Sequence, residues 1–123
     1  MVQKQTKRLV QANEELRISL DNLGKNLIPE PISWLALTKA FEILVEYGWR
    51  FLKKAVEDQG LEAQSPKIAV KQAGKVGLID NPDKWLECID LRNNSVHGYY
   101  TVSREHLAEL AKDLLELTEK LCE

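Results

Sequence analysis

Apolar residues recur at steps of three and four along most of this 123-residue chain. That spacing places them on one face of an α-helix, whereas a half-buried strand needs apolar and polar residues to alternate. No segment alternates for long enough to form a strand, and the β-prone run at residues 99–102 is short. The sequence therefore predicts an all-α fold, an up-and-down bundle of four to five helices, within one domain over residues 1–123.

Proline and glycine mark the expected ends of the first two helices. An apolar stripe from Leu9 to Leu27 predicts the first helix, and the segment 29–31, Pro-Glu-Pro, ends it. A longer helix is expected over residues 33–59, with Gly60 as its stop. The residues that mark its expected buried face are Trp34, Leu37, Phe41, Leu44, Val45, Trp49 and Leu52.

The next two helices begin with the same device, a capping side chain followed by proline. Ser65-Pro66 opens a helix to about residue 76, closed by Gly77, and Asn81-Pro82 opens a fourth. The fourth carries Trp85, Leu86, Ile89 and Val96. We expect Gly98 to close it in the left-handed conformation.

Ser103 caps the fifth predicted helix, which carries a regular leucine stripe. Its leucines at positions 107, 110, 114, 117 and 121 follow a three-four pattern. Such a stripe resembles a coiled-coil seam, but inside a bundle it is ordinarily core.

Composition removes several classes of function. Two cysteines (Cys88, Cys122) and two histidines (His97, His106) are too few and too scattered for a structural zinc site, so we expect no metal. Two buried thiols are expected rather than a disulfide. No glycine-rich phosphate loop is present, and no cofactor is expected. No apolar run is long enough for a membrane span or a signal peptide, which predicts a cytoplasmic chain with no membrane association.

The densest group of chemically versatile residues lies at the end of the fourth helix, in the segment 92–99, Arg-Asn-Asn-Ser-Val-His-Gly-Tyr. Asn93 and His97 lie one turn apart on one helical face. Arg92 and His97 are five residues apart, about 140° around an ideal helix. Their convergence requires Arg92 to wrap around, the helix to loosen before Gly98, or a second copy of the chain. The last option favours a symmetric dimer formed through the bundle.

These residue types suit phosphoryl transfer on RNA. A histidine titrates near neutral pH and can take a proton from a 2′-hydroxyl or give one to a leaving oxygen. An arginine presents a planar fork of donors to the charge that develops on the phosphate. A purely structural role is the alternative: Arg92 would pair with Glu87 or Asp90, and His97 would be favoured by the negative end of the helix dipole.

The spacing of Arg92, His97 and Tyr99 resembles the signature of the HEPN family, in particular of HepT-like toxins, which are also described as nucleotidyltransferase substrate-binding proteins. Further matches follow in the order of the family. They are Phe41-Glu42, Glu46, Trp49-Arg50, Ser65-Pro66, Ala73, the segment 77–79 and Trp85.

The resemblance implies a metal-independent ribonuclease toxin that acts as a homodimer. Arg92 and His97 are then the catalytic pair, and Asn93 is a polar helper. A partner minimal nucleotidyltransferase acts as the antitoxin and transfers AMP to Tyr99; the family pattern selects Tyr99 over Tyr100, between which physical reasoning cannot choose. New negative charge and bulk at this tyrosine would exclude RNA.

Lysines form a further candidate contact for RNA. Lys67, Lys71 and Lys75 repeat every four residues, which predicts a basic stripe along the third helix. An RNA backbone track is one interpretation of this stripe, and a solvated helix face is the other. For the whole chain, a non-catalytic substrate-binding subunit of a nucleotidyltransferase complex is the alternative to the toxin. A purely structural helical dimer is the third interpretation.

Overall fold

The computed structural model describes residues 2–122, with the side chains of residues 6–99 and 101–122, and these residues form an all-α bundle. Its helices are α1 (Val2–Lys25), α2 (Ile32–Asp58), α3 (Pro66–Lys75), α4 (Pro82–His97) and α5 (Arg104–Leu121). A short 3₁₀ turn, η1 (Tyr99–Thr101), connects α4 to α5. The predicted fold class and the five predicted helices are therefore confirmed.

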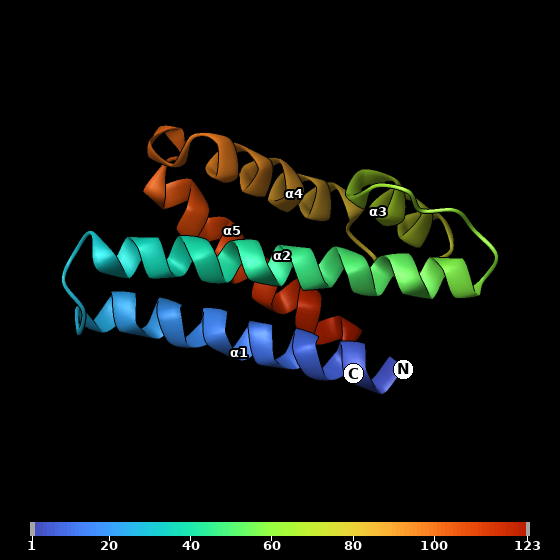
Figure 1. Ribbon diagram of the computed structural model, residues 1–123, viewed down its shortest axis with the longest axis horizontal. Helices are drawn as coiled ribbons and strands as arrows, with labels where there is room; N and C mark the ends of the chain where they lie inside the picture. Colours follow the sequence, from blue (N-terminus) through green and yellow to red (C-terminus); the bar gives the residue numbers. More distant parts are fainter. Residues whose placement is uncertain (1, 123) are drawn as a thin grey trace.

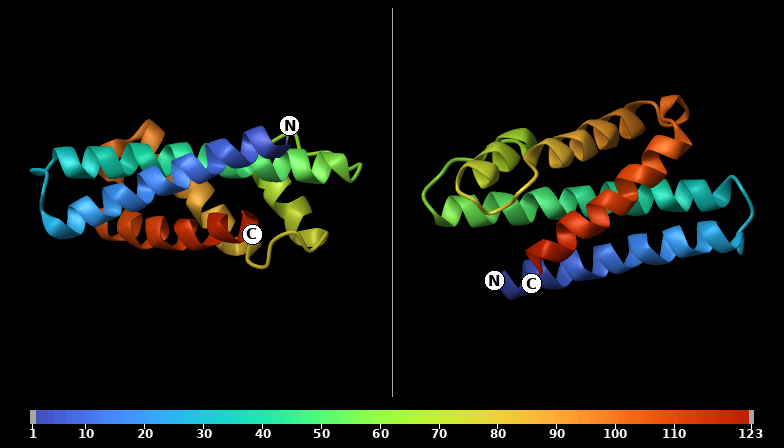
Figure 2. Two further views of the ribbon diagram at one scale, coloured as in Figure 1. Left: turned by 90° about the horizontal axis from the view of Figure 1, so that it is seen from below. Right: turned by 180° about the vertical axis from the view of Figure 1, so that it is seen from behind.

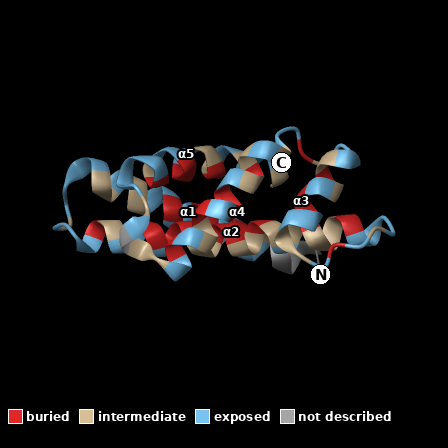
Figure 3. Cartoon of the chain, turned by 90° about the horizontal axis from the view of Figure 1, so that it is seen from above, coloured by how far each residue is buried: buried red, intermediate tan, exposed pale blue. Residues whose placement is uncertain are grey.

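The long α2 helix lies at the centre of the bundle. Figure 1 shows α1 along one side of α2, with α3 and α4 on the other side. Successive long helices run in opposite directions, and α5 crosses obliquely behind α2 to return towards α1 (Figure 2). Buried positions face the interior of this arrangement, and exposed positions lie on the outer faces (Figure 3).

The end of α1 differs from the prediction. The residue after the helix, Asn26, takes a left-handed conformation with φ of 54°, which asparagine tolerates better than most residues. The chain therefore leaves the helix at Lys25, before the end of the apolar stripe. As a result Leu27 is 66% exposed, and its predicted place in the core is wrong.

A close contact between α2 and α4 fixes the position of the candidate site. Trp85 of α4 is fully buried, and a Cβ atom added at Gly48 of α2 would lie 2.9 Å from its ring. Only glycine allows this approach without displacing the indole. The contact brings the residues before Gly48 on α2 beside the last turns of α4.

Candidate functional site

Local sequence determines where α4 begins and ends. The Asn81 side chain accepts a hydrogen bond from the backbone N–H of Lys84 at 3.2 Å, and Pro82 occupies the first turn, as predicted. The helix ends where the N–H of Gly98 donates to the carbonyl of Asn94 at 2.8 Å. Buried Trp85 and Ile89 hold the inner face, which leaves the final turn at the surface of the bundle.

The predicted left-handed conformation of Gly98 is wrong. Its φ is −160°, an extended value that any residue can adopt. A steric reason for glycine remains, because an added Cβ would lie 3.0 Å from the Thr101 hydroxyl oxygen. That hydroxyl donates to the Gly98 carbonyl at 2.6 Å, so η1 folds tightly back against the end of α4.

Arg92 is bonded to a residue that the sequence argument did not assign to it. Its guanidinium donates to Glu46 Oε1 at 2.7 Å and to Asn93 Oδ1 at 3.1 Å. A purely structural role predicted an ion pair of Arg92 with Glu87 or Asp90. Arg92 does form an ion pair, but its partner Glu46 lies on α2. The same Glu46 accepts a 2.6 Å hydrogen bond from Arg50, so one carboxylate joins two arginines.

A second polar link between α2 and α4 lies one turn away. The hydroxyl of Ser95, which is 3% exposed, donates to Glu42 Oε2 at 2.8 Å. Glu42 and Glu46 are four residues apart, so both carboxylates face α4. Glu42 and Glu46 entered the sequence reasoning only as matches to the family pattern, and no role was given to them or to Ser95. The available signal was two acidic residues at helical spacing on a largely apolar helix.

These contacts border a groove between α2 and α4. Its volume is about 340 Å³, and it is lined by Lys39, Glu42, Ile43, Glu46, Tyr47, Arg92 and Val96. The side chains of Arg92 and Glu46 are 28% and 26% exposed, so solvent or a ligand can reach both. Val96, which the sequence assigned to the helix's apolar set, is 57% exposed at the edge of this groove.

His97 lies beyond the groove, exposed at the last position of α4. Within the part of the chain that the structure describes, its side chain has no hydrogen bond or ion pair, and none joins it to Arg92. Asn93, one turn before it, bonds to Arg92 instead. The structure thus brings Asn93 to Arg92 and leaves His97 apart in a single chain.

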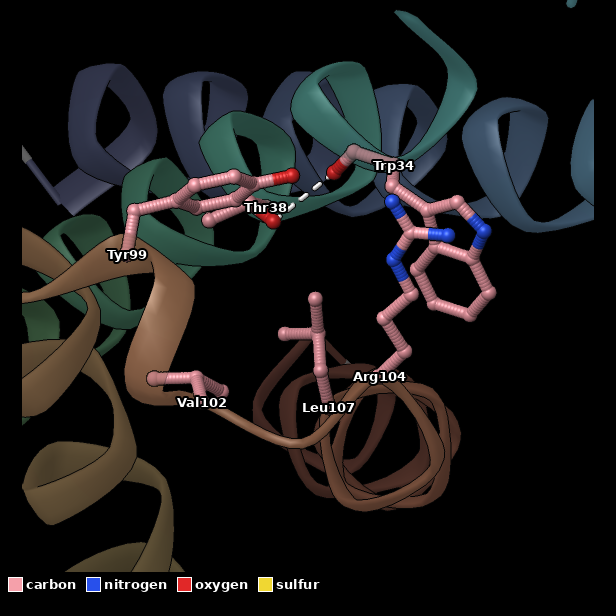
Figure 4. A pocket seen from close by; sticks show the side chains of 6 residues that line it. All are labelled: Trp34, Thr38, Tyr99, Val102, Arg104 and Leu107. Atoms are coloured by element: carbon pink, nitrogen blue, oxygen red, sulfur yellow. Dashed lines mark hydrogen bonds between the residues drawn. The ribbon is translucent and has the colours of Figure 1, made fainter. Parts of the chain in front are cut away.

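Tyr99 lies in η1 and lines a smaller pocket between the first turns of α2 and α5. This pocket, of about 80 Å³, is also lined by Trp34, Thr38, Val102, Arg104 and Leu107. Figure 4 shows the Tyr99 hydroxyl pointing along the pocket towards Thr38 and Trp34, with Arg104 on the same side. The Tyr99 side chain is therefore partly buried.

The lysine stripe on α3 is a mixture of paired and unpaired charges. Lys67 forms an ion pair with Asp90 of α4 at 2.8 Å. Lys71 and Lys75 are exposed, and neither pairs with a carboxylate among residues 2–122. The predicted stripe therefore offers two available cations, and its first lysine attaches α3 to α4.

The cysteines do not form a reactive centre. Both are free thiols; Cys88 is buried, as expected, whereas Cys122 is only partly buried. Burial raises the pKa of Cys88 to about 12 and also raises the pKa of Cys122, so both thiols stay protonated at neutral pH. Among the described residues, no three His, Cys, Asp or Glu side chains gather as metal ligands.

Comparison with known proteins decides the family. The family model described as nucleotidyltransferase substrate binding protein like matches residues 4–123. The chain belongs to this family. A crystal structure of a protein from Thermus thermophilus is similar to this nucleotidyltransferase substrate-binding-like chain, with 26% sequence identity and a TM-score of 0.72. The similarity covers 98% of this chain and 95% of that one.

No curated relative matches this nucleotidyltransferase substrate-binding-like chain. None of the helices described over residues 2–122 has the length and apolar character needed to cross a membrane.

Proposed function

We propose that this chain is a metal-independent ribonuclease toxin of the HEPN type, acting on RNA in the cytoplasm. One observation carries the proposal. The residues of the signature lie close together in the fold: Arg92 and His97 in the last turns of α4, and Tyr99 in η1 directly after it. Arg92 also lines a groove of about 340 Å³. The family match, which covers almost the whole chain, supports the resemblance on which the roles rest.

The cleavage step uses RNA's own nucleophile. His97 in its neutral form accepts the proton of a 2′-hydroxyl, whose oxygen attacks the adjacent phosphorus. The bond from phosphorus to the 5′-oxygen breaks, and that oxygen takes a proton from a protonated histidine. The products are a 2′,3′-cyclic phosphate and a 5′-hydroxyl end. Arg92 stabilises the charge on the phosphate oxygens, and Asn93 orients Arg92 by accepting its N–H.

A homodimer completes this proposed site. Arg92 is bonded to Glu46 and Asn93, whereas His97 lies apart from it. The two side chains of one chain therefore do not converge on a single phosphate. Pairing of two copies through the α2–α4 groove would cover exposed Val96 and partly buried Ile43 and bring the ends of α4 together. Mixing Arg92→Ala protomers with His97→Ala protomers tests this. Shared sites predict partial recovery of activity, and a mixture as inactive as either variant contradicts them.

Lys71 and Lys75, with Lys67, are proposed as contacts for the RNA backbone. They lie on α3, which packs against α4, the helix that carries Arg92 and His97. Replacing Lys71 and Lys75 with uncharged residues should weaken RNA binding and reduce its dependence on salt, while the rate of cleavage at saturating RNA stays unchanged.

Regulation is assigned to Tyr99. A partner minimal nucleotidyltransferase, the antitoxin, supplies ATP as the adenylate donor. The Tyr99 oxygen forms a bond to the α-phosphorus, the bond from that phosphorus to the pyrophosphate oxygen breaks, and the phenolic proton passes to solvent. The adduct adds charge and bulk two residues from His97, which excludes RNA.

A second candidate function is favoured by the family description itself, which names substrate binding. In that case the chain presents a nucleotide to a partner nucleotidyltransferase and cleaves nothing. Expression of the chain alone, and together with its partner, separates the two functions. A toxin arrests growth and degrades RNA when expressed alone, and it cleaves RNA in vitro in the presence of EDTA. A binding subunit leaves growth and RNA intact in both conditions.

The modification has its own test. Tyr99→Phe should stay toxic but resist neutralisation by the partner with ATP, whereas Tyr100→Phe should behave as the parent. Mass spectrometry should find adenylate, roughly 329 Da per unit, on the peptide that contains Tyr99. An adduct on Tyr100 would contradict the assignment of the acceptor and leave the ribonuclease proposal standing.

A further inference from the structure

The pocket beside Tyr99 has no part in the proposed cleavage step, yet it is built from three separate segments. Trp34 and Thr38 come from the first turns of α2, Tyr99 from η1, and Arg104 from the start of α5. Figure 4 shows the Tyr99 hydroxyl and the Arg104 guanidinium on the same side of the pocket. A group attached to the hydroxyl would therefore enter the part of the pocket that Trp34, Thr38 and Arg104 border.

Arg104 is held in place by weak contacts that a stronger ligand can replace. Its guanidinium carbon lies 5.2 Å from the centroid of the Trp34 ring, and its Nη1 lies 3.1 Å from Glu30 Oε2. The stack on Trp34 keeps the guanidinium at the pocket. The side chains of the ion pair with Glu30 are 48% and 60% exposed, so its contribution is small.

The Thr38 hydroxyl of the lining is not available as a donor to an anion. The Thr38 hydroxyl donates to the Trp34 carbonyl at 2.7 Å, which commits its proton. Among the described residues that line the pocket, Arg104 carries the only charge. A negatively charged group in this space therefore meets one cation, Arg104, beside the apolar side chains of Val102 and Leu107.

Volume limits what can enter. A closed cavity of roughly 150 Å³ binds benzene, so the 80 Å³ here is small for a whole nucleobase. The space exceeds the roughly 10–15 Å³ that one water molecule needs by the same measure, which leaves room for a phosphate group. The ligand chemistry that matches both size and charge is a phosphate, with its base and sugar outside.

We propose that this pocket holds the phosphate of the adenylate carried by Tyr99, with Arg104 as its counter-ion. The proposal rests on Tyr99 as the proposed acceptor. The adduct keeps one negative charge on its phosphodiester, and Arg104 exchanges Glu30 for that charge. Arg104 thereby fixes the modified side chain beside the end of α4, so the adduct blocks the site persistently.

The test compares adducts of three proteins: the parent, Arg104→Gln and Arg17→Gln. Arg17 is a matched control, because it is an arginine of similar exposure that pairs with a glutamate, Glu119, on another helix. Each protein is adenylated by the partner with ATP and then digested with a phosphodiesterase that cleaves the bond between tyrosine and AMP. We expect the Arg104→Gln adduct to be cleaved about ten-fold faster than the other two, because one charge-assisted hydrogen bond is lost.

A second variant, with an effect in the opposite direction, keeps the test valid if Arg104→Gln disturbs the fold. Glu30→Gln removes the competing carboxylate and should slow digestion below the parent's rate. Equal digestion of all four adducts overturns the proposal, provided thermal unfolding shows each protein folded. Faster digestion of both Arg104→Gln and Arg17→Gln also overturns it, since protection would then come from net charge.

The failure of adenylation is a distinguishable outcome. If the partner places no AMP on Tyr99, the acceptor assignment fails. Binding of free AMP then tests whether the pocket holds a phosphate. Saturable binding of AMP that Arg104→Gln abolishes and Arg17→Gln retains supports a phosphate site for a free nucleotide. Absence of saturable binding to the parent overturns the pocket as well.

Discussion

Two of the polar networks that connect helices in this bundle differ in the charge of their central groups and in exposure. Between α1 and α5, the Asn13 amide donates to the Thr118 hydroxyl at 2.7 Å and to the Leu115 carbonyl at 3.2 Å. Asn13 is 6% exposed and Thr118 is fully buried. Between α2 and α4, Arg92 bonds Glu46 at the edge of a groove, with both side chains more than a quarter exposed.

The difference separates a structural network from a candidate functional one. At the α1–α5 contact the neutral Asn13 and Thr118 satisfy each other in the interior, where an unpaired partner costs stability. The charged pair of Arg17 and Glu119 borders them at the surface, and Arg17 donates to Asn13 Oδ1 at 3.0 Å. The ionised groups at the α2–α4 contact remain reachable, so a ligand can replace their present partners. We therefore expect substitutions in the first network to change stability alone, and those in the second to change activity far more than stability.

His97 gives the largest expected effect. The His97→Ala variant should lose RNA cleavage by roughly 10²- to 10⁴-fold, because it removes the group that transfers the proton. Its thermal unfolding should match the parent's, since His97 is exposed and bonds no described side chain. The matched control is His106→Ala, the other exposed histidine, which should cleave normally. Cleavage of RNA at the parent's rate by a folded His97→Ala protein would contradict the proposal that this chain is a ribonuclease.

Substitution of Arg92 should give the next largest loss of cleavage, and it tests the role of the planar pair of guanidinium donors. Arg92→Lys keeps the charge but loses the planar pair of donors, so cleavage should fall by roughly 100-fold, nearly as far as in Arg92→Ala. Arg50→Lys is the matched control, because Arg50 bonds the same Glu46 from the exposed side of α2. Equal losses of cleavage in both lysine variants would mean that the two arginines act by holding Glu46 and that Arg92 does not act on the phosphate.

The sequence predicted the helices well because their signals are local. The caps at Ser65, Asn81 and Ser103 all accept the expected backbone N–H, and Gly60 and Gly77 adopt left-handed conformations after their helices. Each of these features depends mainly on residues within one turn, whereas the same kind of signal at Gly98 did not give the left-handed conformation.

The partners of the candidate site could not be predicted in the same way. Arg92 and Glu46 are 46 residues apart, and their contact depends on the packing of Trp85 against Gly48. The nearer glutamate and aspartate on α4 were the reasonable candidates from spacing alone. The pocket at Tyr99 likewise joins segments that are more than 60 residues apart in sequence, so helical periodicity carries no information about it.

Asn13 tests the structural network. Asn13→Ala leaves the Leu115 carbonyl and the Thr118 hydroxyl without this donor, which should cost about 1–3 kcal/mol of the free energy of unfolding. Cleavage by the folded fraction should be unchanged. The control is Asn94→Ala, the same substitution at an exposed position of α4, which should change stability by less than about 0.5 kcal/mol. Urea denaturation measures both, and a loss of cleavage in folded Asn13→Ala would erase the distinction between the networks.

Glu46 should give the smallest effect and the most informative one, since it both holds Arg92 and competes with a phosphate for it. Glu46→Gln keeps the size and one acceptor oxygen but removes the negative charge. RNA should then bind more tightly, which lowers KM, because the phosphate no longer competes with a carboxylate 2.7 Å from Arg92. The value of kcat should fall by a factor of about three to five, the size of a partly exposed ion pair, because Arg92 is held less firmly. Glu57→Gln, which breaks the Lys53 pair at the other end of α2, controls for the loss of one charge on the same helix. A purely structural role for Glu46 predicts lower stability with kcat and KM both unchanged, and steady-state kinetics beside thermal unfolding distinguishes the two.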